Sequence, residues 1–328
     1  QFGNSPFHSH MFALLEKHPG VVVLHDFYLS SVLAYEQMTG AMPRAWTDAL
    51  YHSHGYRAVQ AALAPGGAEQ AKLDYPCNLA VLQNASAVIV HSAYARELAR
   101  SWYGPDAGRN WHVVLHPRSA PPVQAREQAR QALGIAPAAF VVCSFGFVDS
   151  SKLSHRLLEA WRASSLASDS SCELVFVGAN HGGAYGQQLL ESIEAAGAGQ
   201  RIRIAGWTDQ QVYREYLQAA DVGVQLRGSS RGDSSGTVLD CMNYGLPTIV
   251  NANGSMAELH DGAVWKLEDE FALADLVDAL ETLRSDSAVR SGLGARGAAV
   301  IANEQRPEHS ALRYAAVLGR SFDGDLAA

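Results

Sequence analysis

GDSSGTVLDCMNYGLPTIV, residues 232–250, contains a polar loop, a short helix and a strand, in that order. The helix is predicted at 236–244 and ends at Gly245, a residue type that often terminates helices. The β-branched run that begins at Pro247 predicts a buried strand at 247–250. A loop, helix and strand in this order form one unit of an alternating α/β fold.

The start of this predicted helix has the features of a phosphate site. Backbone N–H groups near Ser235, Gly236 and Thr237 have no partner within the helix and favour an anion. Asp240 lies one turn further on, where its carboxylate can accept two hydrogen bonds from a vicinal diol. The segment therefore predicts a site for a ligand that carries both a phosphate and a diol.

The alternation of strands and helices extends through the second half of the chain. Proline density and a lack of apolar periodicity in residues 117–122 indicate a linker, so we place a domain boundary near residue 120. Beyond it the alternation predicts right-handed crossovers and a doubly wound parallel sheet. The predicted strands are 139–145, 173–178, 201–205, 221–226 and 247–250; the helices are 152–165, 185–196, 209–219, 236–244, 271–284, 287–303 and 307–319.

The first half contains fewer strands. Apolar runs at 21–24, 87–90 and 113–115 predict three buried strands, with a mostly helical stretch at roughly 29–84 between the first two. Ligands of parallel sheets bind beyond the carboxyl ends of the strands. This rule gives the expected site positions, which are His25, Asp26 and His91 in the first half and 146–152, 178–181, 206–207 and 227–236 in the second.

Segment 232–250 resembles the donor-binding signature of the GT-B glycosyltransferases of family 4, a large group of retaining enzymes. That signature has two glutamates separated by seven residues, followed by a small residue, three residues and Gly-Leu-Pro. The resemblance gives Asp240 the role of the second acid, which holds the ribose hydroxyls, and Asp233 that of the first acid, near the sugar hydroxyls. Both acids are Asp here and six residues separate them, so the loop is one residue shorter. Ser234, Ser235 and Gly236 are the alternative contacts to sugar and phosphate.

A second match lies after the first strand of the second domain, in residues 144–152. The family binds the donor diphosphate there with an Arg and a Lys. This chain retains Gly146 and Lys152, and it has Phe147 where the Arg is expected. Arg227 or Arg231, which precede the acid segment, are the candidate replacements for the missing charge.

A third match is the strand end Val23-Leu24-His25-Asp26-Phe27. It resembles the family strand whose terminal histidine faces the donor sugar, which gives that role to His25. The fold implied is GT-B, with two Rossmann-like, doubly wound domains that face a cleft. We expect a partial acceptor-side domain at 1–120, because nothing before Gly3 matches the family's opening strand and glycine-rich loop. A nucleotide-sugar-binding domain at 121–305 follows, and then, at 306–328, a helix that crosses back to the first domain and a tail.

The resemblance implies a glycosyltransferase that moves a sugar from a nucleoside-diphosphate sugar to an acceptor hydroxyl, with retention and without a metal ion or cofactor. His25, Lys152 and Asp233 are the expected catalytic residues, and Lys152 with the helix N–H groups would stabilise the departing diphosphate. The expected acceptor is a glycan or a lipid-linked sugar in polysaccharide assembly. The alternatives are a GT-B epimerase or phosphorylase, or a nucleotide-sugar-binding module without turnover. The donor base, the sugar and the acceptor stay open.

Composition excludes other classes of function. The net charge of −8 is spread without basic clusters, which argues against a nucleic-acid partner. The four cysteines lack the close spacing of a zinc site and predict free, buried thiols. With no signal peptide and no bilayer-spanning apolar run, the chain is predicted to be cytoplasmic, with at most peripheral membrane association. Residues 292–297 match the letters of a dinucleotide fingerprint, but they follow a helical stretch and not a strand.

Overall fold

The computed structural model describes residues 1–122, 125–197 and 201–322. The chain divides into two compact units. The first unit comprises Gln1–His116, Arg231–Ser234 and the segment that starts at Glu308, and the second comprises Pro117–Ser230 and Ser235–Pro307. The tail predicted beyond residue 322 lies outside the described residues.

The second unit contains a parallel sheet in the order β6-β5-β4-β7-β8-β9. Its strands are β4 (Phe140–Phe145), β5 (Cys172–Val177), β6 (Ile202–Ile204), β7 (Val222–Gln225), β8 (Thr248–Asn251) and β9 (Trp265–Leu267). Numbered along the unit, this is the order 3-2-1-4-5-6 of a doubly wound nucleotide-binding sheet, which confirms the predicted fold class. Strand β9 was not predicted, because three residues are too few to show a period.

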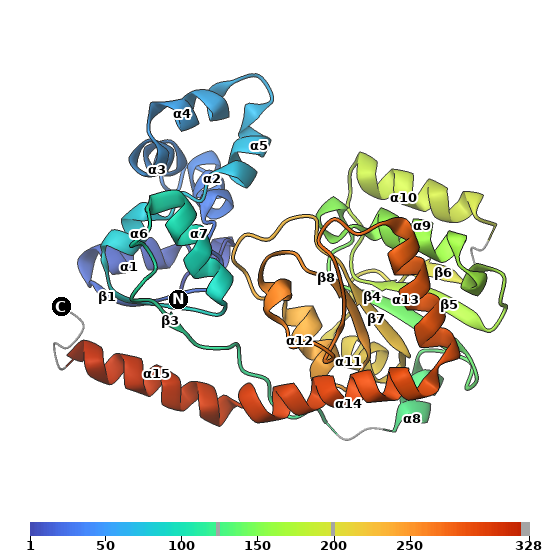
Figure 1. The fold of residues 1–328 in the computed structure, drawn as a ribbon. Helices are drawn as coiled ribbons and strands as arrows, with labels where there is room; N and C mark the ends of the chain where they lie inside the picture. Colours follow the sequence, from blue (N-terminus) through green and yellow to red (C-terminus); the bar gives the residue numbers. More distant parts are fainter. Residues whose placement is uncertain (123–124, 198–200, 323–328) are drawn as a thin grey trace. The chain divides into compact units, whose positions relative to one another are not determined.

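Helices cover both faces of this sheet (Figure 1). They are α8 (Arg126–Ala132), α9 (Ser154–Ala163), α10 (Ala184–Ala195), α11 (Gln210–Ala219), α12 (Gly236–Asn243), α13 (Leu273–Ser285) and α14 (Ser287–Glu304), with the short 3-10 helices η2 (Ser150–Lys152), η3 (Ser165–Ala167) and η4 (Gly254–Glu258). Alternate side chains of β4 point to opposite faces: Val142 packs with α9 residues such as Trp161, and Val141 packs with α11 residues such as Leu217. Burial on both faces explains why the strands are apolar runs and not alternating patterns.

The first unit contains a parallel sheet in the order β1-β2-β3, formed by β1 (Gly20–Leu24), β2 (Ala85–Val90) and β3 (His112–Val113). Its helices are η1 (Pro6–His8), α1 (His10–Lys17), α2 (Ser30–Met38), α3 (Ala45–His54), α4 (Tyr56–Leu63), α5 (Gly67–Asp74), α6 (Leu79–Gln83), α7 (Ala93–Tyr103) and α15 (Pro307–Phe322). Val317 of α15 packs with Val23, Ile89 and Val114 on one side of this sheet. The C-terminal helix is thus part of the first unit's core.

Two further sequence expectations concern cysteines and glycines. All four cysteines are buried and free, as predicted. The glycines at 292–297 lie inside α14, where a Cβ on Gly294 would stand 2.1 Å from the carbonyl oxygen of Gly245. They therefore let α14 approach the end of α12 closely and form no nucleotide loop. Within the described residues, no helix is both long and apolar enough to cross a membrane.

Candidate donor site

The strand order places a ligand crevice at one point of the second unit. From β4 the chain winds outward to β5 and β6, then returns to the other side of β4 to form β7. At such a reversal the connections leave in opposite directions and open a crevice beyond the carboxyl ends of the two central strands. The residues that follow β4 and β7 are therefore the ones that a ligand meets.

Three predicted donor residues from two segments come together here. Gly146 follows β4 with a φ of +105°, a conformation that favours glycine. A Cβ built on it would lie 3.8 Å from Cγ2 of Thr237, at the start of α12, and 4.0 Å from Nζ of Lys152. A Cβ on Gly178, after β5, would stand 1.9 Å from the Gly146 carbonyl oxygen. Only a glycine at 178 allows the two strand ends to approach this closely.

Lys152 is held by a short turn. It ends η2, whose N-cap Asp149 accepts hydrogen bonds from the Lys152 N–H at 3.2 Å and from Ser151 Oγ at 2.7 Å. The Gly228 N–H donates to the Ser151 carbonyl at 2.8 Å, so the loop after β7 is tied to this turn. Arg227 lies on that loop, and the side-chain amide of Asn251 holds its backbone with two bonds of 2.8 Å. The loops that carry Lys152 and Arg227 are thus fixed to each other.

Gln225, the last residue of β7, fixes the position of Thr237. Its side chain is buried, and its amide oxygen accepts from the Phe145 N–H at 2.7 Å. The amide nitrogen then donates to the Phe145 carbonyl at 3.1 Å and to Thr237 Oγ1 at 3.0 Å. One glutamine therefore joins β4, β7 and the start of α12 at the crevice.

Asp240 is not a solvated helix residue. Its Oδ1 accepts from Arg118 Nε at 2.7 Å and its Oδ2 from the Tyr213 hydroxyl at 3.0 Å. Arg118 also donates from Nη2 to the Gly236 carbonyl at 3.0 Å. The Arg118 and Asp240 side chains are only 13% and 30% exposed. Burial and the nearby Asp240 carboxylate raise the pKa of Tyr213, so this hydroxyl stays a donor at neutral pH.

The first part of the acid segment belongs to the first unit. The Phe27 N–H donates to the Arg231 carbonyl at 3.0 Å, and a Cβ on Gly232 would lie 2.6 Å from Cβ of Phe27. Asp233 Oδ1 accepts from the Arg231 N–H at 3.3 Å, and Ser234 Oγ donates to the His91 carbonyl at 3.3 Å. Asp233 and Ser234 therefore lie with the first unit, and Ser235, Gly236 and Asp240 lie with the second.

His25 lies in a cluster of imidazoles within the first unit. Its Nδ1 is 3.0 Å from Nε2 of His91, and its Nε2 is 2.9 Å from Oε1 of Gln1. The ring of His116 lies 5.8 Å from that of His25, centroid to centroid. Burial, and then the neighbouring imidazoles, lower the pKa of His25 to about 4. His25 is therefore neutral at physiological pH.

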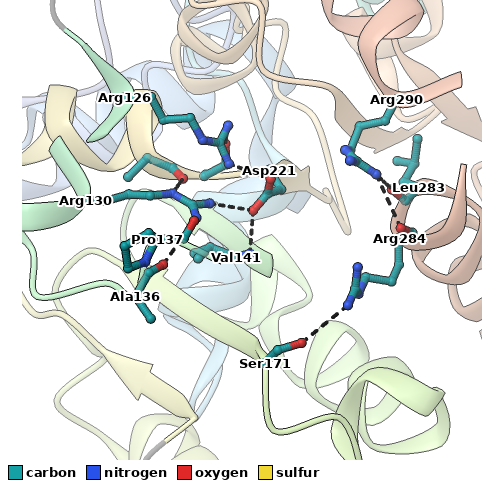
Figure 2. A network of polar contacts seen from close by, with 12 residues as sticks. Arg126, Arg130, Ala136, Pro137, Val141, Ser171, Asp221, Leu283, Arg284 and Arg290 are labelled. Atoms are coloured by element: carbon teal, nitrogen blue, oxygen red, sulfur yellow. Dashed lines mark hydrogen bonds and ion pairs between the residues drawn. The ribbon is translucent and has the colours of Figure 1, made fainter. Parts of the chain in front are cut away.

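A hollow of about 690 Å³ lies at the opposite end of the second unit's strands. Asp221 at its rim accepts from Arg126, from Arg130 Nη2 at 2.9 Å and from the Val141 N–H at 2.8 Å (Figure 2). Phe140, the first residue of β4, also lines it. This end of the sheet holds the amino ends of the strands, and both arginines join α8 to the segment before β7, so we assign the hollow a structural role.

Sequence reasoning missed Arg118, Tyr213 and Gln225. Arg118 lies in the proline-rich segment interpreted as a linker, 122 residues before its partner Asp240. Tyr213 lies on the apolar face of α11 and reads as a core residue. Gln225 did carry a signal, because it is the one amide in the otherwise apolar strand that ends at the crevice.

Solved structures with similar folds include glycosyltransferases. HepE of Anabaena, solved in complex with UDP and glucose, aligns with a TM-score of 0.70 at 16% identity over 96% of this chain and 75% of that one. Sucrose-phosphate synthase of Thermosynechococcus elongatus aligns with a TM-score of 0.69 at 19% identity, covering 97% and 78%. WaaG, a glycosyltransferase of lipopolysaccharide biosynthesis, aligns with a TM-score of 0.65 at 14% identity, covering 94% and 80%. At these identities the likeness establishes the GT-B fold.

No match was found among curated protein sequences. A family model, described as glycosyl transferases group 1, matches residues 125–298. That match spans more than half of the 328 residues and includes the segments that carry Gly146, Lys152 and Asp240. This protein therefore belongs to the group 1 glycosyltransferases, the GT-B family that its acid segment resembles.

Proposed function

We propose that the chain transfers a hexosyl unit from a nucleoside-diphosphate sugar to a hydroxyl of a glycan or lipid-linked acceptor, with retention and without a metal ion or cofactor. The observation that carries this proposal is the meeting of Gly146, Lys152 and Thr237 at the start of α12, beyond the switch point of the second sheet. A lysine, a helix start and a side-chain-free glycine together suit a diphosphate.

Each group has a role in binding the donor. The Lys152 ammonium and the first N–H groups of α12 offset the charge of the diphosphate, and Gly146 leaves room for its oxygens. Arg227, on the loop tied to that of Lys152, supplies the charge that the family holds at the position of Phe147, and Arg231 is the alternative. These cationic and N–H groups stabilise the negative charge of the leaving diphosphate, which is the role of the divalent cation in metal-dependent enzymes.

Asp240 is proposed to hold the ribose. A carboxylate offers about four lone-pair positions, so the bonds from Arg118 and Tyr213 leave room for a diol. The two bonds also fix the direction of the carboxylate before the ligand arrives, which lowers the entropy lost on binding. Arg118 and Tyr213 are positioning residues in this scheme.

The transfer step is proposed to occur on one face of the sugar. The bond from the anomeric carbon to the diphosphate oxygen breaks, and the bond to the acceptor oxygen forms on the same face. The departing diphosphate takes the acceptor's proton. His25 faces the sugar as a neutral imidazole, and Asp233 with Ser234 contacts its hydroxyls. Stabilisation of the leaving diphosphate by Lys152 supplies the main electrostatic contribution.

A donor screen tests the proposal. HepE was solved with UDP-glucose, so uridine diphosphate sugars come first, with GDP and dTDP sugars as alternatives. Ligand-detected NMR should find one base bound by wild type and lost in Lys152→Ala, and added EDTA should not reduce that binding. Transfer is then measured with lipid-linked and free glycan acceptors. Absence of binding to all three donor classes would refute the proposal, and binding without any transfer would favour a module without turnover.

A further inference from the structure

Three histidines from distant parts of the chain meet at one edge of the first sheet. His25 follows β1, His91 follows β2, and His116 lies three residues after β3. Since β1, β2 and β3 are adjacent and parallel, their carboxyl ends lie at the same edge. One nitrogen of each ring lies within 4.8 Å of a nitrogen of the other two. All three belong to the first unit.

The hydrogen bonds of His91 and His25 determine which of their ring nitrogens carry a proton and which carry a lone pair. His91 Nδ1 is 2.8 Å from the carbonyl oxygen of Val114, which can only accept, so Nδ1 carries the proton and Nε2 a lone pair. His91 Nε2 and His25 Nδ1 lie 3.0 Å apart, a hydrogen-bond distance, so His25 Nδ1 donates to His91 Nε2 in the metal-free chain. His25 Nε2 then carries the lone pair of that ring and lies 2.9 Å from the Gln1 side-chain amide. A metal ion bound between the rings would move the His25 proton from Nδ1 to Nε2, and both facing nitrogens would then offer a lone pair to the ion.

The spacing of the nitrogens suits a metal ion. In a tetrahedral zinc site with Zn–N bonds of about 2.0–2.1 Å, the ligand nitrogens are roughly 3.3 Å apart. The His25 and His91 nitrogens are already close to that separation, at 3.0 Å. The His116 nitrogen reaches it with an inward movement of at most roughly 1.5 Å, which a side-chain rotation provides. The carbonyl of Val114 orients His91 from behind, as second-sphere partners of metal-binding histidines commonly do.

We propose that His25, His91 and His116 form a three-histidine site for a divalent transition-metal ion of the zinc type. Three neutral imidazoles suit Zn²⁺, Ni²⁺ and Cu²⁺ and give little affinity for Mg²⁺ or Ca²⁺, which prefer oxygen ligands. Three protein ligands leave a fourth coordination position for water or another small ligand. All three ligands belong to the first unit, whereas Lys152 and α12, which are proposed to stabilise the leaving diphosphate without a metal ion, belong to the second.

Metal titration of the full chain, produced without a histidine tag and stripped with chelator, tests the site. Wild type is expected to bind one equivalent of Zn²⁺, and Co²⁺ in its place should give the visible absorption bands of a four-coordinate ion with nitrogen ligands. His91→Gln and His116→Asn should each weaken Zn²⁺ binding by about 100-fold, and both should lose the Co²⁺ bands. Mg²⁺ should not compete.

His52→Gln is the matched control, because the chain has 13 histidines and surface imidazoles bind metal weakly. His52 is exposed on α3 and bonds only to Gln83 among the described residues. This variant should bind Zn²⁺ like wild type. Circular dichroism of each metal-free variant is measured before titration to confirm that the variant is folded. If His91→Gln or His116→Asn is not folded, His116→Gln is used in its place.

The measurement needs no nucleotide, so its outcome is independent of the proposed glycosyl transfer. Uptake of one equivalent that His52→Gln preserves and His91→Gln weakens about 100-fold supports the site. Absence of stoichiometric binding by wild type would overturn it and leave a hydrogen bond between neutral His25 and His91. Binding that survives in both cluster variants would also overturn it, since the ion would then be held by other residues.

Discussion

Replacing Asp240 with Asn perturbs both the stability of the second unit and the ribose contact. Asp240→Asn keeps the size of the side chain and one acceptor oxygen, and it removes the charge that faces Arg118 across 2.7 Å. A charge-assisted hydrogen bond contributes about 1.5–3 kcal/mol and a neutral one about 0.5–1.5 kcal/mol. Since Asp240 is 30% exposed, solvent screens part of the difference. We expect the free energy of unfolding to fall by about 1–2 kcal/mol.

The effect on ligand binding is separate from this loss of stability. If both carboxylate oxygens also accept from the ribose diol, the Asn amide keeps only one acceptor, because its oxygen accepts and its nitrogen can only donate. One charge-assisted bond is then lost, at about 1.5–3 kcal/mol, which corresponds to roughly 10- to 150-fold in Kd. A nucleoside diphosphate that lacks both ribose hydroxyls should bind wild type and Asp240→Asn about equally, because the partner of the carboxylate is already absent.

Wild type and Asp240→Asn are each titrated by calorimetry with the nucleoside diphosphate and with its analogue that lacks both ribose hydroxyls, the dideoxy ligand. The four affinities form a double-mutant cycle in which the ligand carries one of the two changes. Tyr213→Phe is the matched control, since it removes one bond to Asp240 at 3.0 Å and leaves the charge in place. It should lower stability by about 1 kcal/mol and still discriminate strongly against the dideoxy ligand. If Asp240→Asn discriminates as strongly as wild type, Asp240 does not bind the ribose and the proposed donor orientation is wrong.

Three further outcomes follow from particular contacts. Lys152→Ala should weaken binding of the intact diphosphate sugar by about 1.5–3 kcal/mol and leave binding of the free nucleoside unchanged, and equal losses in a titration of both would exclude a phosphate contact. Asp221→Asn leaves the 6% exposed Arg130 without its carboxylate and should cost about 3 kcal/mol in urea unfolding, whereas Asp48→Asn, from an exposed pair, should cost under about 0.5 kcal/mol; similar costs would contradict a buried structural pair. Burial lowers the pKa of His54 to about 4, and its Nε2 accepts from the Cys77 N–H at 3.1 Å, so only its neutral form fits. The unfolded chain therefore takes up a proton first, and the free energy of unfolding falls as the pH is lowered from 6.5 to 4, by about 2 kcal/mol after a reduction for solvent screening of this partly exposed ring. His54→Gln should flatten this fall, measured as Tm against pH, and an unchanged slope would argue against it.

The strands and helices of the second unit could be predicted well, because the apolar run of each strand and the alternation of strands with helices along the chain indicate the same fold. Each central strand is an apolar run between a polar turn and a helix, so its position follows from the sequence within one or two residues. Strand β9 escaped prediction because its three residues, Trp265–Leu267, are defined by pairing with β8 and not by a period. The first unit was less predictable, since β3 has only two residues and the sequence indicates three.

The donor-site residues fall into two groups that differ in how they can be found. Gly146, Lys152 and Asp240 lie just after strands or at a helix start, and such places are fixed by the order of elements along the chain. Arg118 and Tyr213 reach Asp240 from a connecting segment and from the middle of another helix. Their contribution depends on side-chain directions in three dimensions, which no local pattern records. A proline-rich segment therefore looked like a linker although it carries Arg118, which donates to Asp240 at 2.7 Å.

The histidine cluster was only partly predictable from the topology of the first unit. His25, His91 and His116 are separated by 66 and 25 residues along the chain, and each one alone reads as a histidine at the edge of a core. Two of them could be placed near each other from the rule for strand ends, but the rule does not give the distance between nitrogens or the direction of each ring. Those come from the Val114 carbonyl, which turns Nε2 of His91 toward His25. A backbone acceptor, which no sequence motif records, thus determines whether three scattered imidazoles can share one ion.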